Sequence, residues 1–214
     1  MRVGILGASS VARTLGAGFT THGHQVMLGT RSPETLAEWR AGHPAVAVGS
    51  SAEAAAFGDI VVLAVRGSAA SAALHNAGAA NLAGKPVLDA TNPISDTTGP
   101  VDGVLSFFTG PNESLMERLQ MEFPATHFVK VFNSVGAHLM VNPALPGGPP
   151  TMFICGNDAS AKGVTTEILT QFGWETLDLG TAVAARAIEP LCMLWCIPGF
   201  RENRWGHAFK LLGT

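Results

Sequence analysis

The first 23 residues constrain the fold more than any other stretch of this chain. Arg2–Leu6 is a short apolar run with no charge inside it, which is typical of a buried strand. Residues 7–12 (GASSVA) turn the chain, and a helical pattern then runs from Val11 to Thr21 before Gly23. A strand, a tight turn and a helix in this order deliver backbone N–H groups to a helix N-terminus, where they can bind a pyrophosphate.

The spacing of small residues in this turn is a second signal. The dinucleotide-binding fingerprint is G-x-G-x-x-G/A, and the chain has Gly7, Ser9 and Ala12 at its three positions. Ala12 is small enough for close packing of the helix on the strand, whereas Ser9 narrows the space near a phosphate and adds a hydroxyl donor. We interpret the turn as a nucleotide-binding site; the alternative is a glycine turn in a purely structural α/β unit.

The end of the second predicted strand, Gln25–Gly29, indicates which nucleotide binds. NAD-binding units carry an Asp or Glu about 20 residues beyond the glycines. Here Thr30, Arg31 and Ser32 follow the strand, and no carboxylate occurs before Glu34. A guanidinium and hydroxyls suit a 2′-phosphate, which an acid would repel. We therefore expect NADP rather than NAD, unless Thr30 merely caps a helix and Arg31 is only solvated.

Strands and helices alternate along the rest of the chain. Apolar runs predict further strands at 45–48, 59–65, 86–89, 128–132, 151–155 and 174–178. Helical patterns predict helices at 33–40 (capped by Ser32), 51–57, 69–80, 113–123, 159–172, 180–195 (kinked at Pro190) and 203–212. This alternation predicts an α/β fold of the Rossmann type, with a doubly wound, mostly parallel sheet and a small C-terminal α/β extension. We expect one domain, in which residues 1–133 form the dinucleotide-binding core and residues 134–214 the extension.

Two loops at predicted strand ends are candidates for the reaction site, because doubly wound sheets bind ligands beyond the carboxyl ends of their strands. The fourth strand leads into Val65, Arg66 and Gly67, and the fifth leads into Asn92 and Pro93. We expect both loops beside a bound nicotinamide. Asn92 could hydrogen-bond the ribose or carboxamide, and Arg66 could meet an anionic substrate or a nucleotide phosphate. The alternative is that Asn92-Pro93 is a plain turn.

The segment 94–111 is long for a loop inside a compact domain and is rich in Gly, Pro, Ser and Thr. Such loops are often lids. Phe107 and Phe108 within it either cover a ring system or anchor the core.

Charge argues against a nucleic-acid partner, since the 214 residues have a formal net charge of −3 and no basic run. Only 14% of the residues are charged, so we expect a homodimer that buries the apolar C-terminal helix.

The N-terminus lacks the features of a signal peptide. The best candidate for a membrane span, Ala182–Phe200, is interrupted by Arg186, Glu189 and Pro198. Three cysteines without neighbouring ligands favour a cytoplasmic protein without a metal site.

Seven motifs follow one another along nearly the whole chain in the order of one known family. They are residues 4–15 (GILGASSVARTL), 28–33 (LGTRSP), 89–93 (DATNP), 130–133 (KVFN), 141–143 (VNP), 153–158 (FICGND) and 172–180 (FGW to LG). On these motifs the chain resembles the coenzyme F420-dependent NADP oxidoreductases. It is similar also to the cytoplasmic domain of the STEAP metalloreductases.

The resemblance implies NADP(H) on the N-terminal unit and, as co-substrate, a flavin or the deazaflavin F420 stacked beside the nicotinamide. Carried over by position, it implies phosphate contacts from Ser9, Ser10, Val11 and Arg13, 2′-phosphate contacts from Thr30 and Arg31, and a nicotinamide frame of Val65, Arg66, Asn92 and Pro93. From their places in the same turns, we add Gly7, Ala8, Ser32 and Gly67 as expected cofactor-binding residues. The chain departs from the family at Ser9, which replaces the usual second glycine, and at Arg66-Gly67, where family members often carry a bulkier apolar residue.

The expected reaction is direct hydride transfer between the nicotinamide and an acceptor ring, which needs proximity more than acid–base groups. We accordingly expect no catalytic side chain. The absence of tyrosine excludes a Tyr-x-x-x-Lys short-chain dehydrogenase. Among the histidines only His138 is near the expected site, and a structural role suits it better. Two alternatives stay open: an NADPH-dependent reductase of free flavin, a ferric chelate or another small acceptor, and an NADPH-binding regulatory protein without turnover.

Overall fold

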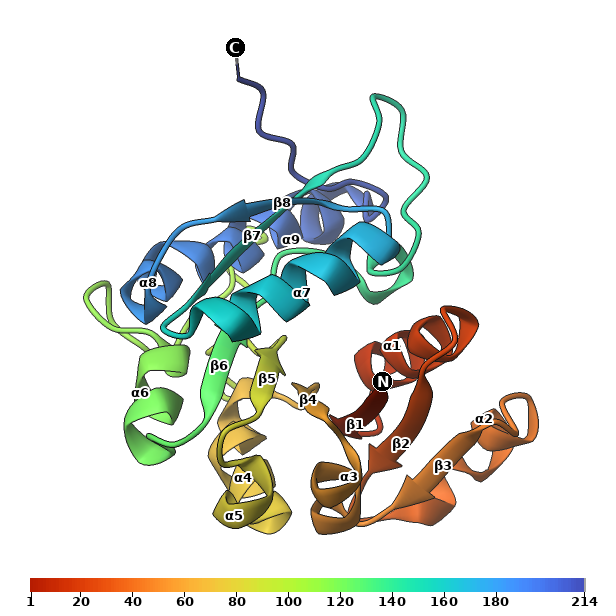
Figure 1. Ribbon diagram of the computed structural model, residues 1–214. Helices are drawn as coiled ribbons and strands as arrows, with labels where there is room; N and C mark the ends of the chain where they lie inside the picture. Colours follow the sequence, from red (N-terminus) through yellow and green to blue (C-terminus); the bar gives the residue numbers. More distant parts are fainter. Residues whose placement is uncertain (214) are drawn as a thin grey trace.

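The computed structural model describes residues 1–213, and within them eight strands form one sheet (Figure 1). The strands are β1 (Arg2–Leu6), β2 (Gln25–Gly29), β3 (Val46–Gly49), β4 (Ile60–Leu63), β5 (Pro86–Asp89), β6 (His127–Lys130), β7 (Thr151–Gly156) and β8 (Glu175–Asp178). Their order across the sheet is β3-β2-β1-β4-β5-β6-β7-β8. The first six strands are parallel, β7 is antiparallel to β6, and β8 is parallel to β7. The predicted doubly wound, mostly parallel sheet is confirmed.

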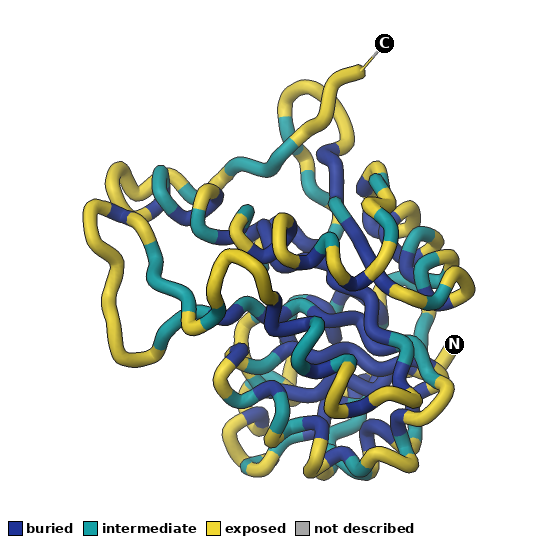
Figure 2. Tube along the Cα trace, turned by 90° about the vertical axis from the view of Figure 1, so that its left-hand side faces the viewer, coloured by how far each residue is buried: buried dark blue, intermediate teal, exposed yellow. Residues whose placement is uncertain are grey.

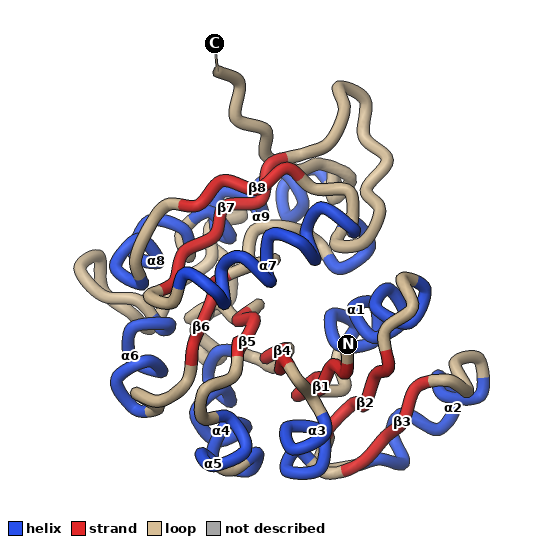
Figure 3. The backbone as a smooth tube through the Cα atoms, in the orientation of Figure 1, coloured by secondary structure: helices blue, strands red, loops and turns tan. Residues whose placement is uncertain are grey.

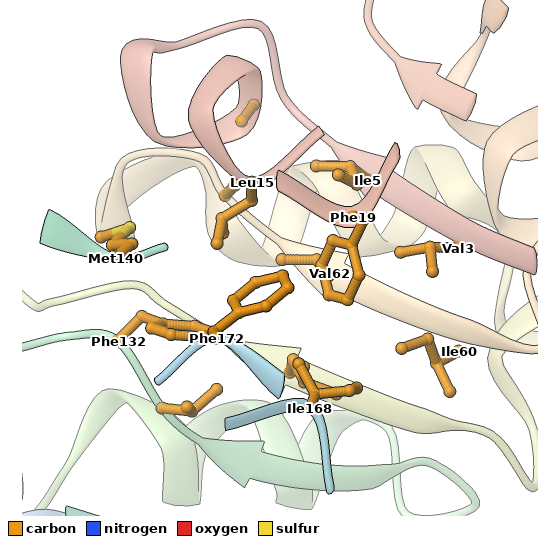
Figure 4. Close-up of a cluster of buried hydrophobic side chains, with 14 of the residues drawn as sticks. Val3, Ile5, Leu15, Phe19, Ile60, Val62, Phe132, Met140, Ile168 and Phe172 are labelled. Atoms are coloured by element: carbon orange, nitrogen blue, oxygen red, sulfur yellow. The ribbon is translucent and has the colours of Figure 1, made fainter. Parts of the chain in front are cut away.

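The sheet is buried on both faces because alternate residues of its central strands reach opposite cores. In β4, Val62 belongs to one core with Phe19 and Phe172, whereas Val61 and Leu63 belong to the other. Figure 4 shows Phe19 and Phe172 beside Val62, and the centroids of the two phenyl rings are 4.9 Å apart. An unbroken apolar run such as β4 therefore fits a central strand, since it has no solvent-facing side.

Helices flank the strands on both faces (Figure 3). The first core takes residues from α1 (Ser10–Thr21) and α7 (Ala159–Gln171). The second takes them from α3 (Ser51–Phe57), α4 (Ala70–Ala77), α5 (Ala79–Leu82), α6 (Leu115–Glu122) and α8 (Ala185–Ile188). The remaining helices are α2 (Ala37–Ala41), α9 (Leu191–Glu202) and the short 3-10 turns η1 (Pro33–Leu36), η2 (Gly67–Ala69), η3 (Ala137–Leu139) and η4 (Ala182–Ala184).

Four of these helices begin at a side-chain cap that the sequence supplies. The caps are Ser9 for α1, Ser50 for α3, Ser114 for α6 and Asp158 for α7, and each accepts a backbone N–H from the third residue after it. Such a cap satisfies one N–H group that no carbonyl within the helix can reach. At α3 the carboxylate of Glu53 also returns a bond to the Ser50 N–H and completes a capping box.

Three predicted helices differ in detail from the structure. The segment 69–80 is divided, because Gly78 with φ +86° separates α4 from α5. The segment 180–195 is also divided, into η4, α8 and the start of α9, and Pro190 stands between α8 and α9. Ser32 stands at the predicted N-cap position before Pro33, but its side chain makes no cap hydrogen bond, and the segment starts as the 3-10 turn η1.

The predicted helix at 203–212 is wrong, because residues 203–213 contain neither helix nor strand. Tertiary contacts hold this segment instead. The Trp195 indole N–H donates to the His207 carbonyl at 2.8 Å, and the Thr151 N–H donates to the Phe209 carbonyl at 2.9 Å. These bonds fix the tail along α9 and β7 in an extended course that an α-helix would not allow.

The helical stretch Ala182–Glu202 is long and apolar enough to cross a membrane by length and composition alone. In the structure it is divided at Pro190, and its residue Glu189 is buried in ion pairs. Figure 2 shows that buried residues follow the strands, whereas most exposed residues lie in loops and on outer helix faces.

Candidate functional site

The turn between β1 and α1 lies at the carboxyl edge of the sheet, where β1 has β2 on one side and β4 on the other. Doubly wound sheets bind their ligands at this switch point. Gly7 in the turn has φ +135°, and a Cβ there would lie 2.4 Å from the Ala64 carbonyl oxygen. The Gly7 N–H donates to the Gly29 carbonyl at 2.9 Å. Glycine is required because the turn lies directly against both neighbouring strands.

The hydroxyl of Ser9 is used by the fold. It donates to the Ala64 carbonyl at 3.0 Å and accepts the Ala12 N–H at 3.4 Å. A hydroxyl has one proton to donate, so in this conformation Ser9 cannot also donate to a phosphate, which is the role that the sequence suggested. Its side chain instead ties the start of α1 to the end of β4.

The N–H groups of Ser10 and Val11 remain for an anion, because the first residues of an α-helix have no carbonyl partner within it. The Arg13 side chain lies back over the turn, and its Nε donates to the Ala8 carbonyl at 3.1 Å. Of the residues predicted to bind phosphate, Ser9 and Ser10 are exposed at the N-terminus of α1, and Val11 and Arg13 are partly buried beside them.

Two adjoining clefts open beside this turn. The first, of about 220 Å³, lies between the turn at Gly7 and Ala8 and the end of β2 at Thr30 and Arg31. The second, of about 520 Å³, shares Thr30 and Arg31 with it and extends over residues 49–53 at the start of α3. The predicted phosphate-binding and 2′-phosphate-binding residues are thus brought together along one edge.

Arg31 is exposed at the junction of these clefts, and within residues 1–213 it forms no ion pair. Thr30 is fixed by its N–H, which donates to the Gly49 carbonyl at 3.0 Å. The Thr30 hydroxyl accepts the Ser32 N–H at 3.2 Å and keeps its own proton for a ligand. This end of the edge therefore offers a cation and a hydroxyl donor to an anionic group.

Glu53 lines the second cleft together with Arg31, and it was not singled out from the sequence. The backbone N–H and hydroxyl of Ser50 hold the pKa of Glu53 below its usual value, so it is ionised at neutral pH. The spacing Ser50-x-x-Glu53 is a capping-box signature and could have predicted this carboxylate at the sheet edge.

A third cleft, of about 540 Å³, lies between the loop after β4 and the long connection after β5. Val65, Arg66 and Gly67 line one part of it, and Thr91 and Asn92 line another. Residues 94–100 and Leu105 complete the wall. Val65 also lines the first cleft, so the two clefts meet at the end of β4. The five residues expected around the nicotinamide lie in these two loops, and the buried Pro93 stands behind Asn92.

Gly67 serves the contact between these loops rather than the width of the cleft. A Cβ on Gly67 would lie 2.0 Å from the carbonyl oxygen of Asn92 and 3.0 Å from a methyl group of Leu115. Gly67 also begins the short turn η2. A larger residue would therefore push the two loops apart before it could fill the cleft.

Arg66 is largely exposed, with its Nη1 3.9 Å from Asp96 Oδ1. The Ser68 hydroxyl also donates to Asp96. Asp96 belongs to the segment 94–111, so this carboxylate holds the long loop against the start of η2 at the rim of the third cleft. Its role was not predicted, because it depends on a contact between two loops.

Asn92 is held by a paired amide, Asn133, at the end of β6. Asn92 Nδ2 donates to the Asn133 carbonyl at 2.8 Å, and Asn133 Nδ2 donates to Asn92 Oδ1 at 3.2 Å. Asn133 Nδ2 also donates to the Ile188 carbonyl at 3.0 Å. The orientation of the Asn92 amide is therefore fixed, and one of its two N–H groups remains for a ligand.

Three fully buried charged side chains lie behind the part of the third cleft that Thr91 and Asn92 line. The sequence analysis did not single them out. Lys130 Nζ is 2.7 Å from Asp89 Oδ2 and 2.9 Å from Glu189 Oε1. Burial alone would lower the pKa of Lys130, but the negative charges of the two carboxylates outweigh it and raise that pKa above its usual value. The signal in the sequence is that Asp89 and Lys130 each end an apolar strand. We call Asp89, Lys130 and Glu189 the buried ion triad.

Other candidates have structural surroundings. Phe107 is partly buried against the cluster of Cys192, Trp195 and Cys196, and Phe108 is partly exposed beneath the Arg118 guanidinium. His138 is exposed beside Gly136 and does not line the three clefts described above. Burial raises the pKa of the Cys155 thiol to about 12, so this cysteine is not a thiolate at neutral pH.

The donors along this edge fit an NADP molecule. Arg31 and Thr30 offer a cation and a hydroxyl at one end, the N–H groups at the start of α1 lie in the middle, and the Asn92 amide lies at the other end. The clefts that these residues line share residues with one another, Arg31 between the first two and Val65 between the first and third. The order matches a 2′-phosphate, a pyrophosphate and a nicotinamide.

Comparisons with known proteins concern the family and the fold. Residues 2–93 match the family model described as NADP oxidoreductase, coenzyme F420-dependent. The crystal structure of a candidate F420-dependent NADP-reductase from Arthrobacter sp. FB24 is 34% identical, with a TM-score of 0.93 and coverage of 100% of both chains. A reductive aminase from Aspergillus terreus, solved with NADPH and ethyl levulinate, is 15% identical with a TM-score of 0.65, over 93% of this chain and 61% of that one. This last likeness concerns the fold alone.

Metalloreductase STEAP3 of Rattus norvegicus is 31% identical over 206 residues, which are 92% of this chain but 38% of the relative. The chain thus spans well under half the length of that protein. Two findings decide the family. The Arthrobacter protein is 34% identical over the full length of both chains, and the family model matches residues 2–93. The chain belongs to the coenzyme F420-dependent NADP oxidoreductases.

Proposed function

We propose that this protein transfers a hydride between NADPH and a flavin-like or deazaflavin ring, with F420 as the first acceptor to test. The observation that carries the proposal is the shared position of Val65. It lines both the cleft beside the phosphate-binding turn and the cleft between the loops after β4 and β5. A nicotinamide that follows the first cleft to its end would meet a molecule in the third.

The residues of the chain bind and orient in this proposal. Ser10 and Val11 donate N–H groups to the pyrophosphate, and Arg31 pairs with the 2′-phosphate, with Thr30 and Ser32 beside it. The remaining N–H of Asn92 donates to the carboxamide or ribose of the nicotinamide half. Val65 supplies apolar surface that excludes water from the ring contact, and the buried Pro93 supports Asn92 from behind.

The bound dinucleotide supplies two electrons and one hydrogen as a hydride, and the acceptor takes one further proton from solvent. Such a transfer needs the reacting atoms roughly 3–3.5 Å apart, and it needs no side chain as acid or base. The hydroxyl groups of Ser95 and Thr97 in the wall of the third cleft can hydrogen-bond an acceptor that carries polar substituents around a flat ring.

The decisive experiment measures NADPH oxidation with F420, FMN, FAD and a ferric chelate in parallel. NADPH deuterated on either face of C4 is used with any acceptor that reacts. We expect reduction of a ring acceptor and transfer of deuterium from one face only. With F420, which as a deazaflavin accepts the hydride on a ring carbon, deuterium released wholly to solvent would contradict direct transfer. With FMN or FAD the accepting N5–H exchanges with water, so the readout there is a primary isotope effect from one face of C4 only.

The same assay separates the alternatives. Turnover with the ferric chelate alone would favour a metal reductase, which the likeness to STEAP3 makes worth including. Tight NADPH binding without oxidation by any of the four acceptors would favour a regulatory nucleotide-binding protein.

A further inference from the structure

The buried ion triad has no part in the proposed chemistry, yet it lies directly behind the third cleft, between the loops after β4 and β5, which we call the acceptor cleft after the proposed function. The exposed fractions of Asp89, Lys130 and Glu189 are 0%, 0% and 1%. Three charges without access to water are costly to bury, and apolar residues of similar volume often stabilise a core equally well. Stability alone therefore gives a weak reason for placing them here.

Two members of the triad hold the backbone of a residue that lines the cleft. Lys130 Nζ donates to the Thr91 carbonyl at 2.9 Å. Asp89 Oδ1 accepts the Thr91 N–H at 2.9 Å and the Thr91 hydroxyl at 2.6 Å. The carbonyl, the N–H and the hydroxyl of Thr91 are thus all bound to charged side chains, which form stronger hydrogen bonds than neutral ones.

The third member connects this wall to the C-terminal helices. Glu189 stands just after α8, and its carboxylate accepts the Leu115 N–H at 2.9 Å and the Met116 N–H at 3.0 Å at the start of α6. The neighbouring Ile188 carbonyl accepts from Asn133, which in turn holds Asn92. Two successive residues of the cleft wall are therefore tied to the same short segment beyond β8.

We propose that Lys130 is a positioning residue for hydride transfer: with Asp89 and Glu189 it fixes the Thr91–Pro93 loop against the C-terminal helices and so sets where the nicotinamide ring lies. The inference rests on the proposed function. It does not extend to the phosphate end of the nucleotide, because the turn at Gly7 and Ser9 is held by Gly29 and Ala64 instead.

The test compares Lys130→Met with a variant in which the whole triad is neutral, Asp89→Asn/Lys130→Met/Glu189→Gln. The neutral variant is included because the single change leaves two buried carboxylates without a cation. The matched control is Lys162→Met on α7, which removes a partly buried ion pair to Asp178 away from the three clefts. Folding is checked first by circular dichroism and thermal unfolding.

Three quantities are then measured for each folded variant: the Kd of NADPH, the emission spectrum of its bound dihydronicotinamide, and kcat with the acceptor found above. We expect the Kd of NADPH to stay within about threefold of wild type, because most of its contacts are at the phosphate end. We expect a shifted emission spectrum and a kcat lower by about 10- to 100-fold, the scale for reacting atoms misplaced by about 1 Å. Lys162→Met should match wild type in all three.

Unchanged emission and kcat in a folded triad variant would overturn the proposal, and so would failure of both variants to fold, which would assign the triad to stability. If none of the tested acceptors supports NADPH oxidation by the wild-type protein, the proposed function fails. The emission of bound NADPH still tests the positioning role in that case. The two failures are therefore distinguishable.

Discussion

A Cβ atom on Gly67 would lie 2.0 Å from the carbonyl oxygen of Asn92. This contact between the loops after β4 and β5 is made by backbone atoms, which cannot rotate away as a flexible side chain can. The two loops that line the acceptor cleft are therefore in direct contact only while residue 67 is glycine.

We predict that Gly67→Ala destabilises the protein by at least about 1–3 kcal/mol, the usual cost of overpacking a buried site. Gly163→Ala is the control, because Gly163 lies within α7 with no atom near its Cβ position. Alanine there should stabilise the protein by about 0.5–1 kcal/mol. Denaturant unfolding of both variants gives the sign of each change in the free energy of unfolding. A Gly67→Ala protein as stable as wild type would contradict the close contact between residue 67 and the Asn92 carbonyl.

The second prediction concerns nucleotide choice. Arg31→Ala should weaken NADPH binding by about 1.5–3 kcal/mol, the scale of a hydrogen bond to a charged group, and should leave NADH binding nearly unchanged. Arg40→Ala, on the neighbouring helix α2, serves as the control for general loss of positive charge. Calorimetric titration with both nucleotides tests this, and equal losses for NADPH and NADH would exclude a 2′-phosphate contact.

The third prediction concerns pH. The Arg186 guanidinium binds Glu117 through Nη2 at 2.7 Å and Nε at 2.9 Å, and this hydrogen bonding holds the pKa of Glu117 below the 4.5 of a free glutamate. A lowered folded-state pKa gives a contribution that is complete above the unfolded pKa and is lost as the pH falls through the folded one. Because Arg186 is partly exposed, we expect about 1 kcal/mol at pH 7.

Glu117→Gln should therefore cost stability at pH 7 and cost progressively less below about pH 4.5, as urea unfolding of both proteins across this range would show. Glu167→Gln, on the exposed side of α7, is the matched control for loss of one glutamate charge. A difference that grows on acidification would have the wrong sign for this pair.

A fourth prediction is that the protein is a homodimer. In α9 the side chains of Leu194 and Phe200 are 55% and 46% exposed, which is unusual for two large apolar residues on one helix. Leu194→Glu should shift light scattering from dimer to monomer, whereas Leu179→Glu, at a similarly exposed leucine after β8, should not. A wild-type monomer at micromolar concentration would count against this interface.

Elements with local boundary signals could be predicted from the sequence. β1, β2, β5 and α3 begin and end at the predicted residues. In α3 the reason is visible, since Ser50 and Glu53 cap its start and Gly58 follows its end. The tail at 203–212 could not be predicted in this way, because its course depends on bonds to Trp195 and Thr151, which a local pattern does not contain.

The same division applies to the candidate site. The loops at Gly7, Arg31, Val65 and Asn92 follow from the rule that ligands bind at the carboxyl ends of parallel strands, and the structure lines three adjoining clefts with them. Asp89, Lys130 and Glu189 were missed because each looks like an ordinary polar residue at the end of an element. Only the fold brings their three distant segments together.

The charges of the buried ion triad do not cancel, because two carboxylates and one ammonium leave one negative charge in excess. That excess lies at the start of α6, where Glu189 accepts the N–H groups of Leu115 and Met116 and where the helix end carries a partial positive charge. Glu189 and the N-terminus of α6 therefore offset each other's charge only when α6 and the segment after α8 are both in place. Residues 1–133 expressed alone would keep Lys130, its partner Asp89 and the open N-terminus of α6 but would lack the Glu189 carboxylate that binds both, so we expect this fragment to unfold at a lower denaturant concentration than the whole chain.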